Sequence, residues 1–113
     1  MIGTNNINES NMQRDVVQYV SYIITYCRKL GINVIFMTNT PLQNVGSKDK
    51  IVLQANNRVA YGYGIEQINL YGEIERYLYD HSMQLSAIMA DNLHPNDLGY
   101  SLIYEVICDA LKL

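Results

Sequence analysis

The sequence predicts an α/β fold with a three-layer α/β/α arrangement, in which helices cover both faces of a parallel sheet. Amphipathic helical patterns alternate along the chain with short runs of apolar and β-branched residues, the pattern of repeated βα units. The chain has 113 residues, of which 49% are hydrophobic and 17% charged, and this suffices for one core. We therefore expect residues 1–113 to form a single domain, or part of one.

The first half of the chain predicts a long helix followed by a buried strand. Ser10 and Gln13 have the spacing of a capping box, and apolar residues then recur at helical spacing over residues 10–30. Gly31 supplies a stop for this helix. The run over 32–38 is mostly apolar and β-branched, which predicts a strand buried on both faces.

The second half repeats this order. Residues 49–61 predict a second helix that ends near two glycines, and the alternating pattern over 65–70 predicts a second strand. The residues 71–79 have a pattern that could instead extend a helix back into this strand. Residues 96–113 predict a C-terminal helix, because apolar side chains recur at helical spacing after Pro95.

The predicted sheet is too small to cover these helices. Only two whole strands are visible, and Met1-Ile2 is typical of the last residues of a third strand whose beginning is absent. We therefore expect a fold truncated at its N-terminus, with uncovered apolar faces and an open sheet edge. This predicts a homo-oligomer, or pairing with a missing N-terminal half.

The tyrosines of the first helix allow two interpretations. Tyr19, Tyr22 and Tyr26 recur at i, i+3 and i+7, and the chain contains ten tyrosines and no tryptophan. Aromatic rings at this spacing favour packing or a helix–helix contact over stacking on a sugar.

Charge and composition exclude several classes of partner. Eight Lys and Arg against eleven Asp and Glu give a net charge of −3 with no run of like charges, so no nucleic-acid partner is expected. No apolar stretch approaches the ~20 residues that span a bilayer. Cys27 and Cys108 lie on apolar sides of helices, which predicts buried free thiols. His, Cys and carboxylate side chains are nowhere at ligand spacing, so we expect no metal site.

The N-terminal residues bear on localisation. Residues 1–6 lack a basic region, an apolar core and a cleavage site. This indicates a cytoplasmic protein if Met1 is the true start, and leaves secretion open if a longer protein carries an upstream signal.

Two segments stand apart from the packing pattern, and the first is Gly3-Thr4-Asn5-Asn6. It follows the Met1-Ile2 stub, at the sheet edge where open α/β folds bind ligands. The side-chain amide of Asn5 could donate to a developing oxyanion. The alternative is that the paired asparagines only form a turn and cap the helix.

The second segment is Asp91-Asn92-Leu93-His94, again on a loop before a helix. An Asp three residues before a His can bind one imidazole nitrogen and leave the other free as a base. The alternative is a helix-capping Asp and an unrelated surface His.

Together these segments resemble two sequence blocks of the SGNH/GDSL hydrolase family. The third block, Gly-x-Asn-Asp, matches residues 3–6 except that Asn6 replaces the usual Asp, and the fifth block, Asp-x-x-His, matches residues 91–94. The continuation over 95–100, Pro-Asn-Asp-Leu-Gly-Tyr, also follows the family's frequent run. The resemblance implies a flavodoxin-like three-layer fold and ester hydrolysis without a cofactor. It also implies that Asn5 is an oxyanion-hole donor, His94 the general base and Asp91 its orienting partner.

The chain departs from the family in what precedes these blocks. The family's first block, a Gly-Asp-Ser that supplies the nucleophile, and its second lie N-terminal to the third, where this chain begins. No serine of the chain follows a Gly-Asp. The leading hypothesis is the C-terminal portion of a serine esterase or acylhydrolase of SGNH type, inactive alone, for an acetyl or acyl ester that could be carbohydrate- or lipid-linked. The alternative is a noncatalytic remnant that acts as a binding or assembly module.

Overall fold

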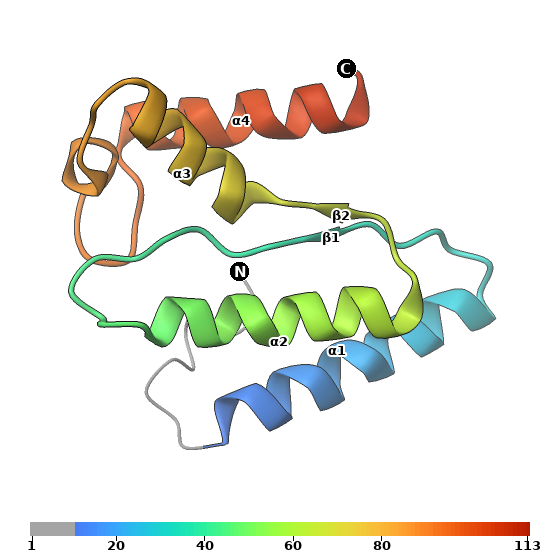
Figure 1. Ribbon diagram of the computed structural model, residues 1–113. Helices are drawn as coiled ribbons and strands as arrows, with labels where there is room; N and C mark the ends of the chain where they lie inside the picture. The colour runs from blue at the N-terminus through green and yellow to red at the C-terminus, as the bar shows by residue number, and fades with distance from the viewer. Residues whose placement is uncertain (1–10) are drawn as a thin grey trace.

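The computed structural model describes residues 11–113 of the chain. In chain order the elements are α1 (Met12–Lys29), β1 (Phe36–Met37), α2 (Lys48–Tyr63), β2 (Gln67–Ile68), α3 (Leu70–Asp80), the 3-10 helix η2 (Leu85–Ile88) and α4 (Asp97–Leu111) (Figure 1). The predicted strand stub Met1-Ile2, the cap at Ser10 and the candidate donor Asn5 lie outside the described residues.

The two predicted strands form a parallel pair, with Phe36 opposite Gln67 and Met37 opposite Ile68. Each strand is only two residues long, shorter than the sequence predicts. The expected burial of the 32–38 strand on both faces is wrong, because Ile32 and Ile35 are exposed. Side chains alternate along an extended segment, and the face of Phe36 is covered by helices whereas that of Ile35 is only partly covered.

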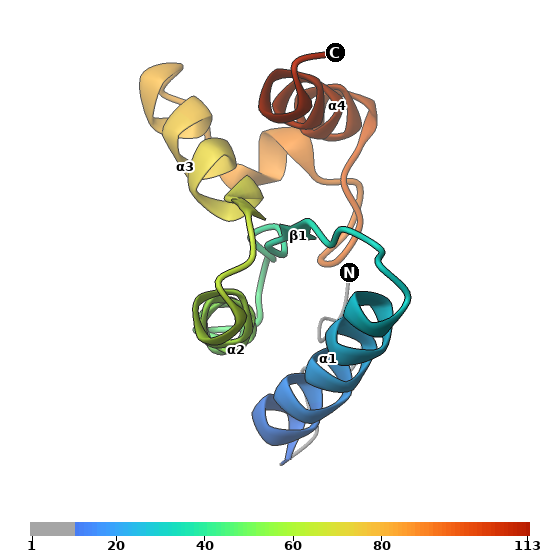
Figure 2. The ribbon, with the colours of Figure 1, turned by 90° about the vertical axis from the view of Figure 1, so that its right-hand side faces the viewer.

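Two apolar clusters lie on opposite sides of this sheet (Figure 2). One cluster joins α1, α2 and Phe36, and the other joins α3, η2 and α4, with Met37 packed against it. The sheet therefore holds the two pairs of helices together.

Helix α1 is present where the sequence predicts it, and it ends before Gly31, whose φ of 72° is left-handed. Only part of its apolar arc is covered. One row of side chains packs toward α2: Met12, Val16, Val20 and Ile24. A neighbouring row is exposed over half of its surface or more: Tyr19, Tyr22, Ile23, Tyr26 and Leu30. The packing that we expect of the tyrosines is therefore not made within the described chain.

The remaining helices differ from the predictions at their ends. Helix α2 ends at Gly64, which has a left-handed φ of 61°. Helix α3 begins at Leu70, because the side chain of Asn69 accepts the backbone N–H of Gly72, so the last predicted strand residue is helical. Within residues 11–113 no helix is both long and apolar enough to cross a membrane.

Both cysteines are free, but the expectation that they are buried is wrong, since each is half-buried. Cys27 lies at the border of the covered arc of α1. Cys108 lies near the end of α4, whose buried residues, Gly99 and Leu102, are in its first half.

Candidate functional site

The Asp91–His94 segment lies on the loop between η2 and α4. This loop is beside the segment that follows β1, at the end of the sheet where both parallel strands finish (Figure 1). Ligands of open α/β sheets bind at this edge.

The structure brings Asp91 and His94 into direct contact. Nδ1 of the imidazole lies 2.9 Å from Oδ2 and 3.1 Å from Oδ1 of the carboxylate. Oδ1 also accepts the backbone N–H of His94 at 2.6 Å and that of Leu93 at 2.7 Å. These bonds, with that from the backbone of His94 first, lower the pKa of Asp91 to about 2, and the imidazole adds to the effect. The carboxylate is therefore charged at neutral pH.

This contact fixes the chemistry of the imidazole. A charged carboxylate can only accept, so a neutral His94 carries its proton on Nδ1 and a lone pair on Nε2. Nε2 makes no hydrogen bond to any residue in the described part of the chain, and the His94 side chain is 67% exposed. The pair can therefore accept a proton from a hydroxyl group brought to this surface.

Asp91 does not cap α4, because Asn96 does. The Asn96 side chain accepts the backbone N–H of Gly99 at 3.0 Å and donates to the carbonyl of Ala87 at 2.9 Å. The backbone N–H of Asn96 donates to the carbonyl of Ile88 at 2.9 Å. A Cβ on Gly99 would lie 2.3 Å from that same carbonyl oxygen. The Pro-Asn-x-x-Gly run therefore packs the start of α4 against the root of the loop.

A second support for the loop was not visible in the sequence. The backbone N–H of Gln43 donates to the backbone carbonyl of Asn92 at 3.1 Å, and the side-chain amide of Gln43 donates to the backbone carbonyl of Asp91 at 3.2 Å. The Asn44 side chain donates to that of Asn92 at 2.8 Å. Nothing in the pattern of residues 42–50 beyond its polarity distinguishes Gln43 and Asn44.

Asn5, the third predicted site residue, lies outside the described residues. The expected convergence of Asn5 and His94 therefore stays a prediction. Within residues 11–113 no serine side chain is hydrogen-bonded to His94. The described residues thus hold an imidazole and the carboxylate that contacts it.

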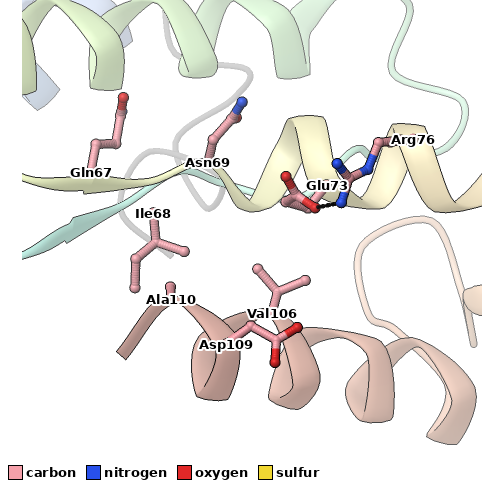
Figure 3. A pocket seen from close by; sticks show the side chains of 8 residues that line it. All are labelled: Gln67, Ile68, Asn69, Glu73, Arg76, Val106, Asp109 and Ala110. Atoms are coloured by element: carbon pink, nitrogen blue, oxygen red, sulfur yellow. Dashed lines mark hydrogen bonds and ion pairs between the residues drawn. The ribbon is translucent and has the colours of Figure 1, made fainter. Parts of the chain in front are cut away.

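A cleft of about 360 Å³ lies elsewhere, between β2, α3 and α4 (Figure 3). Glu73 and Arg76 of α3 form an ion pair in it, and Val106 and Asp109 of α4 face them. Asp91 and His94 do not line this cleft. Among the described residues, no three His, Cys, Asp or Glu side chains gather as metal ligands do.

Comparisons with known proteins identify the fold. By sequence, no protein-family model and no curated protein matches the chain. By structure, the chain is similar to an acetyl xylan esterase, AlAXEase, with a TM-score of 0.70, 16% identity, and 87% of this chain covering 55% of that one. It is equally similar to LAE5, an alpha/beta hydrolase enzyme from the metagenome of Lake Arreo, Spain, with a TM-score of 0.70, 16% identity, and 88% of this chain covering 46% of that one.

The chain spans about half the length of these two hydrolases. At this level of identity the likeness shows the fold alone, and it confirms an α/β fold of the kind that these hydrolases have.

Proposed function

We propose that this chain is the C-terminal portion of a serine esterase or acylhydrolase of SGNH type, with the three-layer flavodoxin-like fold of that family. The observation that carries the proposal is the Asp91–His94 contact at the carboxyl end of the parallel strands. Two findings support it: the sequence blocks at residues 3–6 and 91–94, and a fold shared with about half of an acetyl xylan esterase.

In the proposed reaction His94 is the general base. Nε2 takes the proton of a serine hydroxyl as the oxygen attacks the carbonyl carbon of an ester, and the imidazolium then returns the proton to the leaving alcohol. Water attacks the acyl-enzyme in the same way, which releases the acid. Asp91 holds the ring and stabilises the imidazolium, and Asn5 donates its amide to the oxyanion.

The serine is supplied from outside this chain in this proposal. The exposed row on α1 is where such a partner would pack: Tyr19, Ile23, Tyr26 and Leu30 recur at i, i+4, i+7 and i+11, and all are more than half exposed. A contiguous row of this spacing is typical of a helix that packs against another helix. The partner that the proposal assigns to this row is the other part of the hydrolase fold.

Assays of two proteins test the proposal: the 113-residue chain, and the same chain with the protein segment encoded upstream in its source gene. With an activated acetyl ester we expect no turnover and no fluorophosphonate labelling of the chain alone, because the nucleophile is missing. We expect the longer protein to be labelled at one serine, to hydrolyse the ester and to be monodisperse by light scattering. His94→Ala should abolish its turnover, while His81→Ala, the matched control on α3's C-terminal end, should not.

Stoichiometric labelling of a serine in the 113-residue chain would contradict this proposal. An upstream segment without a Gly-Asp-Ser, or a longer protein that does not hydrolyse esters, would favour the noncatalytic assembly module instead. In such a module the exposed row on α1 would be the surface that contacts its partner.

A further inference from the structure

A buried carboxylate lies beneath the segment that follows β1. Asp49, in the first turn of α2, is only 4% exposed. Its Oδ2 accepts the backbone N–H of Leu42 and the hydroxyl of Tyr71, each at 3.1 Å, and its Oδ1 accepts the backbone N–H of Lys50 at 2.9 Å. Burial, and then the charge of Asp49, raise the pKa of Tyr71, so its hydroxyl remains a donor.

Further buried bonds fix the same segment from both sides. The hydroxyl of Thr38 accepts a hydrogen bond from the backbone N–H of Tyr71 at 2.9 Å, and this bond joins the segment to α3. The side chain of Asn39 donates a hydrogen bond to the carbonyl of Asp49 and accepts one from the side chain of Asn56, both at 3.2 Å. These two bonds join the segment to α2. Hydrogen bonds in a buried site such as this one are costly to break, so residues 38–42 are rigidly placed.

The next two residues of this rigid segment reach the Asp91–His94 loop. Gln43 and Asn44 together donate three hydrogen bonds, to the carbonyls of Asp91 and Asn92 and to the Asn92 side chain. The side chains of residues 91–94 are all exposed, so burial contributes little to holding this loop in place. Within the loop, the backbone N–H groups of Ala90 and Asp91 donate to the carbonyl of His94 at 2.8 and 3.4 Å. Gln43 and Asn44 supply the bonds that join this loop to the segment after β1.

We infer that Gln43 and Asn44 are positioning residues, which hold the Asp91 carboxylate against Nδ1 of His94. The contacts alone assign this positioning role, whereas its consequence for catalysis rests on the proposed function. If these bonds are removed, only the loop's own bonds, those of Ala90, Leu93 and His94, hold the carboxylate, so the loop opens more often. In the open form the carboxylate turns toward water and His94 can carry its proton on Nε2, which then has no lone pair to accept the proton of a serine.

The test uses the tautomer of His94, measured by nitrogen NMR of the imidazole rings in the 113-residue chain. The chain has two histidines, and His94→Gln assigns the signals. The test variants are Asn44→Gly and the double variant Gln43→Ala/Asn44→Gly. Glycine retains the left-handed backbone of Asn44, whose φ is 56°, and removes only its amide.

The control variant is Asn57→Ala, which removes an exposed amide pair of the same kind, Gln67 to Asn57 at 3.0 Å, on another part of the surface. His81 is an internal reference, since its Nδ1 lies 2.8 Å from the carbonyl of Tyr77.

We expect His94 to hold its proton on Nδ1 in the unaltered chain and in Asn57→Ala. In the double variant, and to a smaller extent in Asn44→Gly, the Nε2-protonated form should become detectable while the His81 signals stay unchanged. Unchanged His94 signals in the double variant, or an equal change in Asn57→Ala, would overturn the inference.

The catalytic consequence is tested separately in the longer protein. There the double variant should lower kcat by up to about 10²-fold with little change in KM, because the base is misplaced but the ester contacts remain. A tautomer that responds in a longer protein without esterase activity would refute the proposed function and leave the positioning role standing. Esterase activity with an unresponsive tautomer would refute only the positioning role.

Discussion

Replacing Gly99 by alanine tests whether the start of α4 packs tightly against the root of the Asp91–His94 loop. The new Cβ would lie 2.3 Å from the carbonyl oxygen of Ile88 and 2.7 Å from the Cβ of Pro95. Ile88 contributes a backbone atom that cannot rotate away, so α4 and the loop must separate. Such overpacking costs about 1–3 kcal/mol, and loss of the Asn96 bond to the Ile88 carbonyl adds about 1 kcal/mol.

The gain in helix propensity opposes this cost by at most about 1 kcal/mol. The matched control is Gly62→Ala in α2, where the added Cβ meets nothing within 4 Å. The control should therefore raise the free energy of unfolding by about 0.5–1 kcal/mol. We expect Gly99→Ala to lower it by about 1–3 kcal/mol.

Urea unfolding followed by circular dichroism measures both values, and thermal unfolding should separate the two variants by roughly 10 °C. A Gly99→Ala chain as stable as the unaltered one, or as stable as Gly62→Ala, would show that α4 can move away from Ile88 at no cost. Gly99 would then not be required for close packing of α4 against the carbonyl of Ile88.

Two further predictions concern single carboxylates. Tyr71→Phe should lower the free energy of unfolding by about 1.5–3 kcal/mol, because it removes a hydrogen bond to the buried carboxylate of Asp49. Urea unfolding measures this change, and an unchanged midpoint would contradict the prediction. A carbon NMR titration of Asp91 should give a midpoint near pH 2. Since this folded pKa lies below the unfolded value of about 3.9, the stabilising contribution of Asp91 is present above about pH 4 and lost as the pH falls toward 2; a midpoint near 3.9 would show that the loop bonds are absent in solution.

The order of the elements and their places along the chain could be predicted from local patterns of residues. The helical periodicities of the sequence predicted α1, α2 and α4 nearly at their observed bounds, because apolar spacing reports which face of a helix is buried. Glycines marked the ends of α1 and α2, where a left-handed backbone is required. The three-residue spacing of Asp91 and His94 was sufficient to predict that one side chain could reach the other, since both lie on the same short loop.

The bonds that join the Asp91–His94 loop to the segment after β1 could not be predicted in this way. Gln43 and Asn44 are distant from Asp91 in sequence, and their roles follow from a crossing of two loops that no local pattern encodes. In the sequence, Asp49 has the pattern of an ordinary polar residue at the start of a helix. It is buried because the fold places the backbone N–H of Leu42 and the hydroxyl of Tyr71 against its carboxylate. Strand length and the exposure of Ile35 likewise depend on which segments cover the sheet. Local propensity specifies elements, whereas contacts between distant segments specify the environment of each side chain.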